Sequence, residues 1–233
     1  MKRKIFALLL GAALCFGLIS AAYADDTTLN TESGSPKLEY HDPNPTPPPP
    51  GSVEEDPDDE PVNPFTDVKP GDFYYDAVLW GLEEGITGGS GKFGPDSVCS
   101  RGETVTLLWR AAGSPKPSGS NSPFTDVRAG DYYFDAILWA VEQGVTNGTS
   151  PTTFSPGETV NRGQAMTFFY RAVKAQDVGG GNPFIDVPED AYFAGPVRWA
   201  VSRGITEGTS PTTFSPEEGC TRGHIITLLY RAS

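Results

Sequence analysis

Three arginines recur at equivalent places along the chain, and they are the side chains best suited to bind a ligand. Each opens a predicted helix, in the sequences Ser-Arg-Gly-Glu, Asn-Arg-Gly-Gln and Thr-Arg-Gly-His: Arg101, Arg162 and Arg222. A cation in the first turn opposes the helix macrodipole, which favours an acid there. A guanidinium beside exposed N–H groups at a helix start can hold a carboxylate or phosphate through paired hydrogen bonds. The three positions therefore predict anion-binding sites.

The neighbours of each arginine fit both a helix cap and a ligand site. The preceding residue is a good N-cap in every copy. Glu103 and Gln164 stand where they complete a capping box, whereas His224 in the third copy can titrate. A glycine follows each arginine and leaves room for a group to approach the backbone: Gly102, Gly163 and Gly223. An aspartate recurs once per copy and offers an ion pair as the alternative to a ligand: Asp67, Asp126 and Asp186.

One tryptophan also recurs in each copy: Trp80, Trp139 and Trp199. On a predicted helix at 133–143, Trp139 lies about 200° from Ile137, nearly opposite the apolar stripe. The ring either packs beneath its own loop or lines a groove where an aromatic face meets a sugar ring. We favour packing because a side chain of this size usually anchors a core.

The positions of these residues follow an internal repeat of about 60 residues. The sequences Asn-Pro-Phe-Thr-Asp-Val, Ser-Pro-Phe-Thr-Asp-Val and Asn-Pro-Phe-Ile-Asp-Val open three units, which end in Trp-Arg-Ala or Tyr-Arg-Ala. We expect repeats at 63–118, 119–178 and 179–233. Repetition of this kind predicts that each unit completes its core only by packing on its neighbours.

Each repeat has the pattern of a helix, a loop and a second helix. In the second repeat, helical periodicity runs over 133–143, Gly144 ends the helix, and turn residues fill 145–156 before a helix begins near Asn161. We predict an all-α fold in which six helices share one core. Two sets of aromatic residues are expected in that core: Phe93, Phe154 and Phe214, and Tyr74, Tyr133 and Tyr192.

Two cysteines, Cys99 and Cys220, lie two residues before an arginine, and Val160 takes the same place in the second repeat. The valine indicates a small apolar site, so we predict free, buried thiols. Equivalent positions of three separate units should lie farther apart than the roughly 7 Å that a disulfide tolerates.

Composition excludes several classes of protein. The 30 acidic residues outnumber 17 lysines and arginines, which argues against nucleic acid as the main partner. The three cysteines and two histidines lack the spacing of a zinc cage, and no Ser-His-Asp set, H-E-x-x-H or P-loop motif stands out. We therefore predict no enzyme activity, no catalytic residues, no metal site and no cofactor.

The first 62 residues predict export and a spacer. Lys2, Arg3 and Lys4 precede an apolar stretch and an Ala-Tyr-Ala cleavage site, which is typical of a signal peptide at 1–24. Residues 25–62 are acidic and proline-rich, with almost no large apolar side chains, and predict a disordered linker. After cleavage we expect no insertion into a membrane.

The repeated motifs resemble those of the S-layer homology family. They are the Phe-x-Asp-Val opening, the Trp-Ala-Val-x-x-Gly-(Ile/Val)-Thr helix end, the Phe-x-Pro before the second helix and the Thr-Arg-Gly-x start, and together they cover residues 63–233. The resemblance implies three helix–loop–helix units around a pseudo-threefold axis, with three grooves. It also implies a secreted protein of the cell wall or S-layer that binds secondary cell-wall polysaccharide non-covalently, often a polymer with pyruvylated sugars.

In that family the second helix typically begins Thr-Arg-Ala-Glu, and its arginine contacts the acidic group of the polymer. The resemblance assigns this role to Arg101, Arg162 and Arg222. Here glycine replaces the alanine, and the glutamate is kept only as Glu103, so we expect the three sites to differ in affinity. The alternative function is a surface assembly or adaptor protein whose repeats serve protein–protein contacts.

Overall fold

A computed structural model describes residues 62–233. The predicted signal peptide and all but the last residue of the predicted linker lie outside the described residues. Six helices and no strand form the described part, which confirms the all-α prediction there: α1 (Tyr75–Glu83), α2 (Arg101–Ala111), α3 (Phe134–Glu142), α4 (Arg162–Ala172), α5 (Ala194–Ser202) and α6 (Arg222–Ala232). Within residues 62–233, no helix combines the length and apolar character that crossing a membrane requires.

Local sequence explains where these helices begin and end. Ser100, Asn161 and Thr221 each accept a hydrogen bond from the backbone three residues on, and each forms a complete capping box. The third box uses His224, whose Nδ1 accepts from the Thr221 N–H at 3.3 Å. After the first helix of each repeat, a glycine in the left-handed region ends the helix: Gly85, Gly144 and Gly204.

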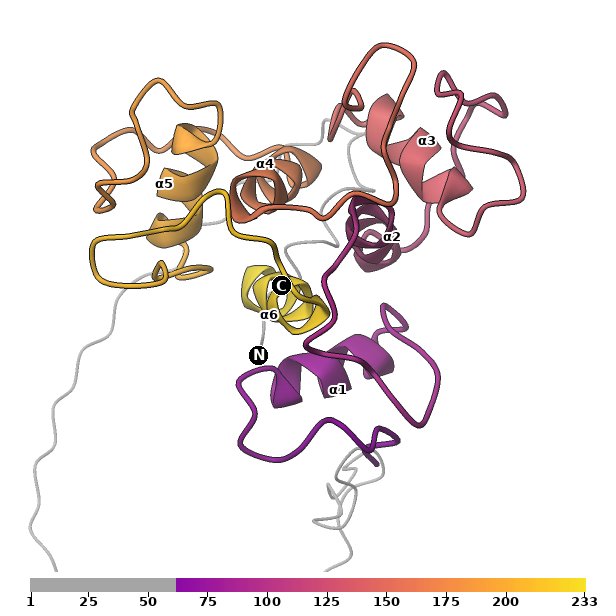
Figure 1. The fold of residues 1–233 in the computed structure, drawn as a ribbon, viewed down its shortest axis with the longest axis horizontal. Helices are drawn as coiled ribbons and strands as arrows, with labels where there is room; N and C mark the ends of the chain where they lie inside the picture. The colour runs from indigo at the N-terminus through magenta and orange to yellow at the C-terminus, as the bar shows by residue number, and fades with distance from the viewer. Residues whose placement is uncertain (1–61) are drawn as a thin grey trace, which may run out of the picture. The chain divides into compact units, whose positions relative to one another are not determined.

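The main helix contacts run between repeats rather than within them. The second helix of each repeat packs against the first helix of the next, so that α2 contacts α3 and α4 contacts α5. In the same way α6 contacts α1, and α2 also contacts α4 and α6. Figure 1 shows α2, α4 and α6 at the centre, with α1, α3 and α5 outside them. The last repeat therefore packs on the first, and the three form a closed set.

A ring of three backbone hydrogen bonds joins the three segments that lead into α2, α4 and α6. The N–H of Cys99 donates to the carbonyl of Cys220, that of Cys220 to Val160, and that of Val160 to Cys99, at 2.8, 2.9 and 3.1 Å. Both thiols are free and buried, as predicted. The predicted separation is wrong, because these positions converge where the three repeats meet and bond directly through their backbones.

The two thiols should make stability depend on pH above neutrality. Burial raises the pKa of Cys99 from 9.0 to about 11 and that of Cys220 to about 12. The unfolded chain then loses these protons first, so the free energy of unfolding should decrease as pH rises through 9. At pH 10 we expect a loss of about 1 kcal/mol for each thiol, measured by urea unfolding.

The control for this pH dependence is the double variant Cys99→Val/Cys220→Val, which copies the valine of the second repeat. Its free energy of unfolding should decrease less between pH 8 and 10 than that of the wild type. Equal slopes for the two proteins would contradict the assignment of the pH dependence to the thiols.

Candidate anion-binding grooves

Each predicted arginine reaches the loop of the following repeat. The Nε of Arg101 donates to the carbonyl of Phe154 at 3.0 Å, and its guanidinium lies 4.9 Å from the centre of that ring. Arg162 makes the same two contacts with Phe214. Arg222 makes them with Phe93, across 129 residues of sequence. All three phenylalanines are buried in the core, as predicted.

The three aspartates hold the same loops from the other side. Asp126 accepts hydrogen bonds from the N–H groups of Phe154 and Ser155, and Asp67 and Asp186 accept from the equivalent pairs. Burial alone would raise the pKa of Asp67, but the backbone N–H bonds and the charge of Lys92 together outweigh it and lower the pKa below its usual value. Among the described residues no ion pair joins these aspartates to the three arginines. An Asp–Arg pair therefore does not account for the arginines.

Protein atoms occupy the space beside the glycines and bind the N–H groups at the helix starts. A Cβ at Gly223 would lie 2.8 Å from the Tyr74 ring, and the other two glycines face Tyr133 and Phe193 in the same way. The N–H groups of Arg101 and Gly102 donate to carbonyls of the next repeat's loop. A ligand would therefore meet the guanidinium groups and not the helix N–H groups.

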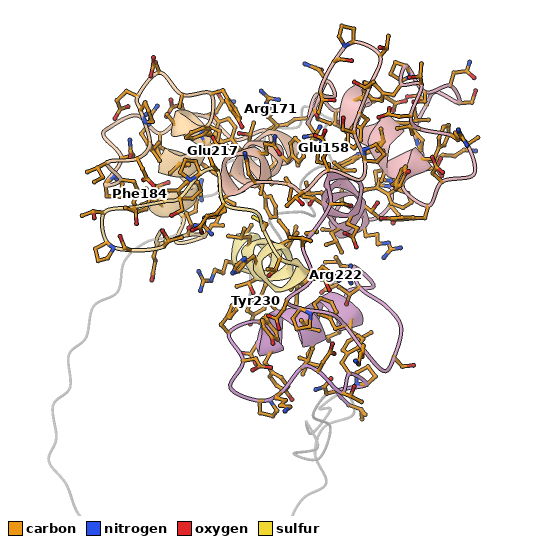
Figure 2. The ribbon with its side chains drawn as sticks, in the orientation of Figure 1. Glu158, Arg171, Phe184, Glu217, Arg222 and Tyr230 are labelled. Carbon is orange, nitrogen blue, oxygen red and sulfur yellow. The ribbon has the colours of Figure 1, made fainter. Side chains whose placement is uncertain are left out.

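A cleft of about 430 Å³ lies beside Arg101. We call it the Arg101 groove. All three repeats contribute to its lining, which consists of Arg101, Thr146, Asn147, Gly148, Thr149, Gln164, Thr167, Phe168, Arg171 and Tyr192. Figure 2 shows Arg171 on α4, and Arg222 where α6 meets α1. The groove thus combines two guanidinium groups, hydroxyl and amide side chains and an exposed aromatic ring, with no carboxylate in its lining.

Arg101 retains unused hydrogen-bonding capacity. Only 3% of the residue is exposed, and its Nη2 has no hydrogen-bond partner. Burial lowers its pKa, although Glu158, Tyr192 and Asp126 act in the opposite direction. Since an unsatisfied buried donor costs about 1–3 kcal/mol, an arriving carboxylate that accepts from this group would recover that free energy.

The tryptophans lie away from the arginines. The ring of Trp80 packs on Tyr230 and that of Trp199 on Tyr170, at 5.6 and 5.8 Å between centres. Tyr230 is near the end of α6 and Arg222 is at its start, about 12 Å apart along the helix. Trp139 is buried as well. These contacts favour the packing interpretation, with the rings between repeats rather than beneath their own loops.

An exposed aromatic residue at Arg101 was missed by sequence reasoning. Tyr192 lines the Arg101 groove and is 58% exposed, so the prediction that places it in the core is wrong. Phe193 takes the core position instead, equivalent to Tyr74. The signal was the alignment of Asp-Phe-Tyr, Asp-Tyr-Tyr and Ala-Tyr-Phe, which sets Tyr192 in register with Phe73 and Tyr132.

Known proteins share these repeats. The family model of the S-layer homology domain matches three segments, 64–105, 123–166 and 183–226, and each falls inside one predicted repeat. Together the segments cover more than half of the chain.

Proteins with larger chains contain similar regions. The chain is 34% identical over 101 residues to a Surface-layer 125 kDa protein of Lysinibacillus sphaericus, which covers 43% of this chain and 8% of that protein. It is 33% identical over 123 residues to an Endoglucanase of Bacillus sp. (strain KSM-635), and this match covers 52% of this chain and 13% of the endoglucanase. A Cell surface glycoprotein 1 of Acetivibrio thermocellus is 26% identical over 154 residues, and this match covers 61% of this chain and 7% of the glycoprotein. The chain thus spans about a tenth of the length of these relatives, and it belongs to the S-layer homology domain family.

Proposed function

We propose that this protein is an exported module that binds an acidic secondary cell-wall polysaccharide non-covalently and is held at the cell wall by it. The grooves between the repeats, arranged around a pseudo-threefold axis, are the binding surfaces. A signal peptide at 1–24 directs export, and residues 25–62 form the linker. The module itself is not an enzyme. The relatives support a surface location, since two of them are named as surface proteins.

The unpartnered Nη2 of buried Arg101 is the observation that carries the proposal. A guanidinium held by its Nε on one loop carbonyl, with Nη2 unpaired, is set to receive a carboxylate. Arg171 adds a second cation at the same groove, and Tyr192 offers an aromatic face to a sugar ring. A carboxylate-bearing sugar such as a pyruvylated one combines both features.

Selectivity for an acidic polymer also follows from the difference in charge between the Arg101 groove and the chain as a whole. The chain has a net charge of −13, so an acidic polymer is repelled by most of the protein at long range. The two arginines of the Arg101 groove lie in a lining that contains no carboxylate. Binding should therefore depend on close contact at the groove rather than on overall charge.

The test is cosedimentation of the full secreted chain with purified wall sacculi, before and after acid removal of the polysaccharide. Binding should require the polymer, and Arg101→Ala and Tyr192→Ala should each weaken it about tenfold or more. Tyr192→Ala removes an exposed ring, so it keeps the test valid if Arg101→Ala does not fold, as judged by circular dichroism.

Arg128→Ala is the matched control, because it removes an exposed arginine outside the groove. It should leave binding unchanged. Equal binding to stripped sacculi, or binding that ignores the Tyr192→Ala change, would reject the proposal and favour an assembly or adaptor role.

A further inference from the structure

The third residue of each central helix lies beside the arginine of the preceding repeat. Glu103 pairs with Arg222, its Oε1 being 3.1 Å from Nη1. Gln164 lines the Arg101 groove. His224 lies near Arg162, whose charge, after burial, helps to lower the histidine pKa. Each of the three arginines thus has a different neighbour at this helix position: a glutamate, a glutamine or a histidine.

Glu103 already gives Arg222 a carboxylate partner. Both side chains are about three-quarters buried, with 25% and 28% of their surface exposed, so water screens the pair less than at an open surface. An anion that approaches Arg222 must compete with this carboxylate or accept a groove whose charge it has partly cancelled. The pair therefore lowers the affinity of this groove for acidic groups.

Gln164 gives Arg101 no charge to pair with. Its Oε1 accepts from the Asn161 N–H at 3.3 Å and so serves the capping box, as Glu103 does in the first repeat. The nearby acids Glu158 and Asp126 influence the pKa of Arg101, but neither is within ion-pair distance of it. The charge of Arg101 is thus not neutralised by an ion pair.

The surroundings of Arg162 differ from both of these, because its neighbour is a histidine. Burial and the charge of Arg162 lower the pKa of His224 below its usual value, which favours the neutral imidazole. In the loop of the third repeat, Glu207 takes the position that Asn147 has in the second repeat. Glu207 is exposed and acidic. No ion pair of the described residues involves Arg162.

We propose that the residue at positions 103, 164 and 224 ranks the three grooves for acidic ligands, with the Arg101 groove the tightest and the Arg222 groove the weakest. This inference rests on the proposed function for its biological ligand, but the ranking concerns small anions as well. One side chain per groove, already required as a helix cap, thereby also determines how strongly that groove binds acids.

The test exchanges the two residues and titrates the protein with methyl β-D-glucuronide, a sugar with one carboxylate. The arginine Nε–H signals in ¹H–¹⁵N NMR spectra report each groove separately. In the wild type the Arg101 signal should saturate first. Gln164→Glu should weaken that site about tenfold, and Glu103→Gln should strengthen the Arg222 site by about fivefold to tenfold.

Both exchanges preserve the helix caps, because glutamate and glutamine each complete a capping box in the wild-type chain. Glu83→Gln and Gln143→Glu make the same charge changes at exposed positions and should leave the order of the sites unchanged. Thermal unfolding checks that all four variants fold.

Arg101 and Arg222 sites of equal affinity in the wild type, or exchanges that leave both sites unaltered, would overturn the inference. Cosedimentation with sacculi separates this failure from that of the proposed function. If sacculi do not bind but the glucuronide order holds, only the proposed function fails. If sacculi bind and the order is absent, only the ranking fails.

Discussion

Phe154→Ala should destabilise the protein by about 4 kcal/mol, within the range for removing a fully buried phenylalanine. The Phe154 ring has no exposed surface and packs against Phe124, with 5.6 Å between the two ring centres. It also carries the guanidinium of Arg101 on its face at 4.9 Å. The substitution leaves a cavity at the contact between two repeats, and urea unfolding followed by circular dichroism measures the loss.

The control for this change is Phe73→Ala, the same truncation at a ring that is 61% exposed. It should cost less than about 1 kcal/mol. Similar losses from the two truncations would show that the loop beneath Arg101 contributes little to the core.

Gly208→Ala should destabilise the protein by about 3 kcal/mol. The residue has φ +86°, and a Cβ there would lie 2.4 Å from the Phe184 ring and 2.5 Å from the Thr213 carbonyl oxygen. The left-handed conformation costs an alanine roughly 1–2 kcal/mol, and the clash with backbone adds about 1–3 kcal/mol because the carbonyl cannot rotate away.

Gly204→Ala separates these two costs. Its φ is +69°, yet a Cβ would meet nothing within 4 Å. It should show only the conformational cost. The difference in urea midpoint between the two variants then measures the clash, and identical midpoints would contradict a tight loop at Gly208.

The elements of the fold could be predicted because they are encoded locally. Helical periodicity, the caps at Ser100, Asn161 and Thr221 and the stop at Gly144 each depend on residues within one or two turns. The repeat itself indicated a shared core, and the phenylalanine positions within it followed from their recurrence.

What the sequence did not reveal depends on contacts between repeats. Cys99 and Cys220 are 121 positions apart and meet only because the third repeat closes on the first. The aromatic ring beside Gly102, Gly163 or Gly223 comes from the next repeat. The sequence around each glycine therefore does not show what fills the space beside it. Tyr192 was misplaced by one position, since two adjacent aromatic residues allow either to face the core.

For the arginines, one part of the prediction was correct and another part was wrong. Their unfavourable position relative to the helix dipole correctly marked them as unusual, but the N–H groups of α2 donate to the neighbouring loop and not to a ligand. Glu103, Gln164 and His224 distinguish the three arginines, since only Arg222 has an ion-pair partner among the described residues. Their position beside an arginine of another repeat is visible only in the folded chain.

The closed set of repeats has a mechanical consequence. In an open row of repeats, an end unit is held by one neighbour and can be pulled away by breaking that single contact. Here the first repeat holds the second through Arg101 and is held by the third through Arg222. A pull applied at the start of the first repeat is therefore resisted by two contacts, and that repeat can detach only after both have broken.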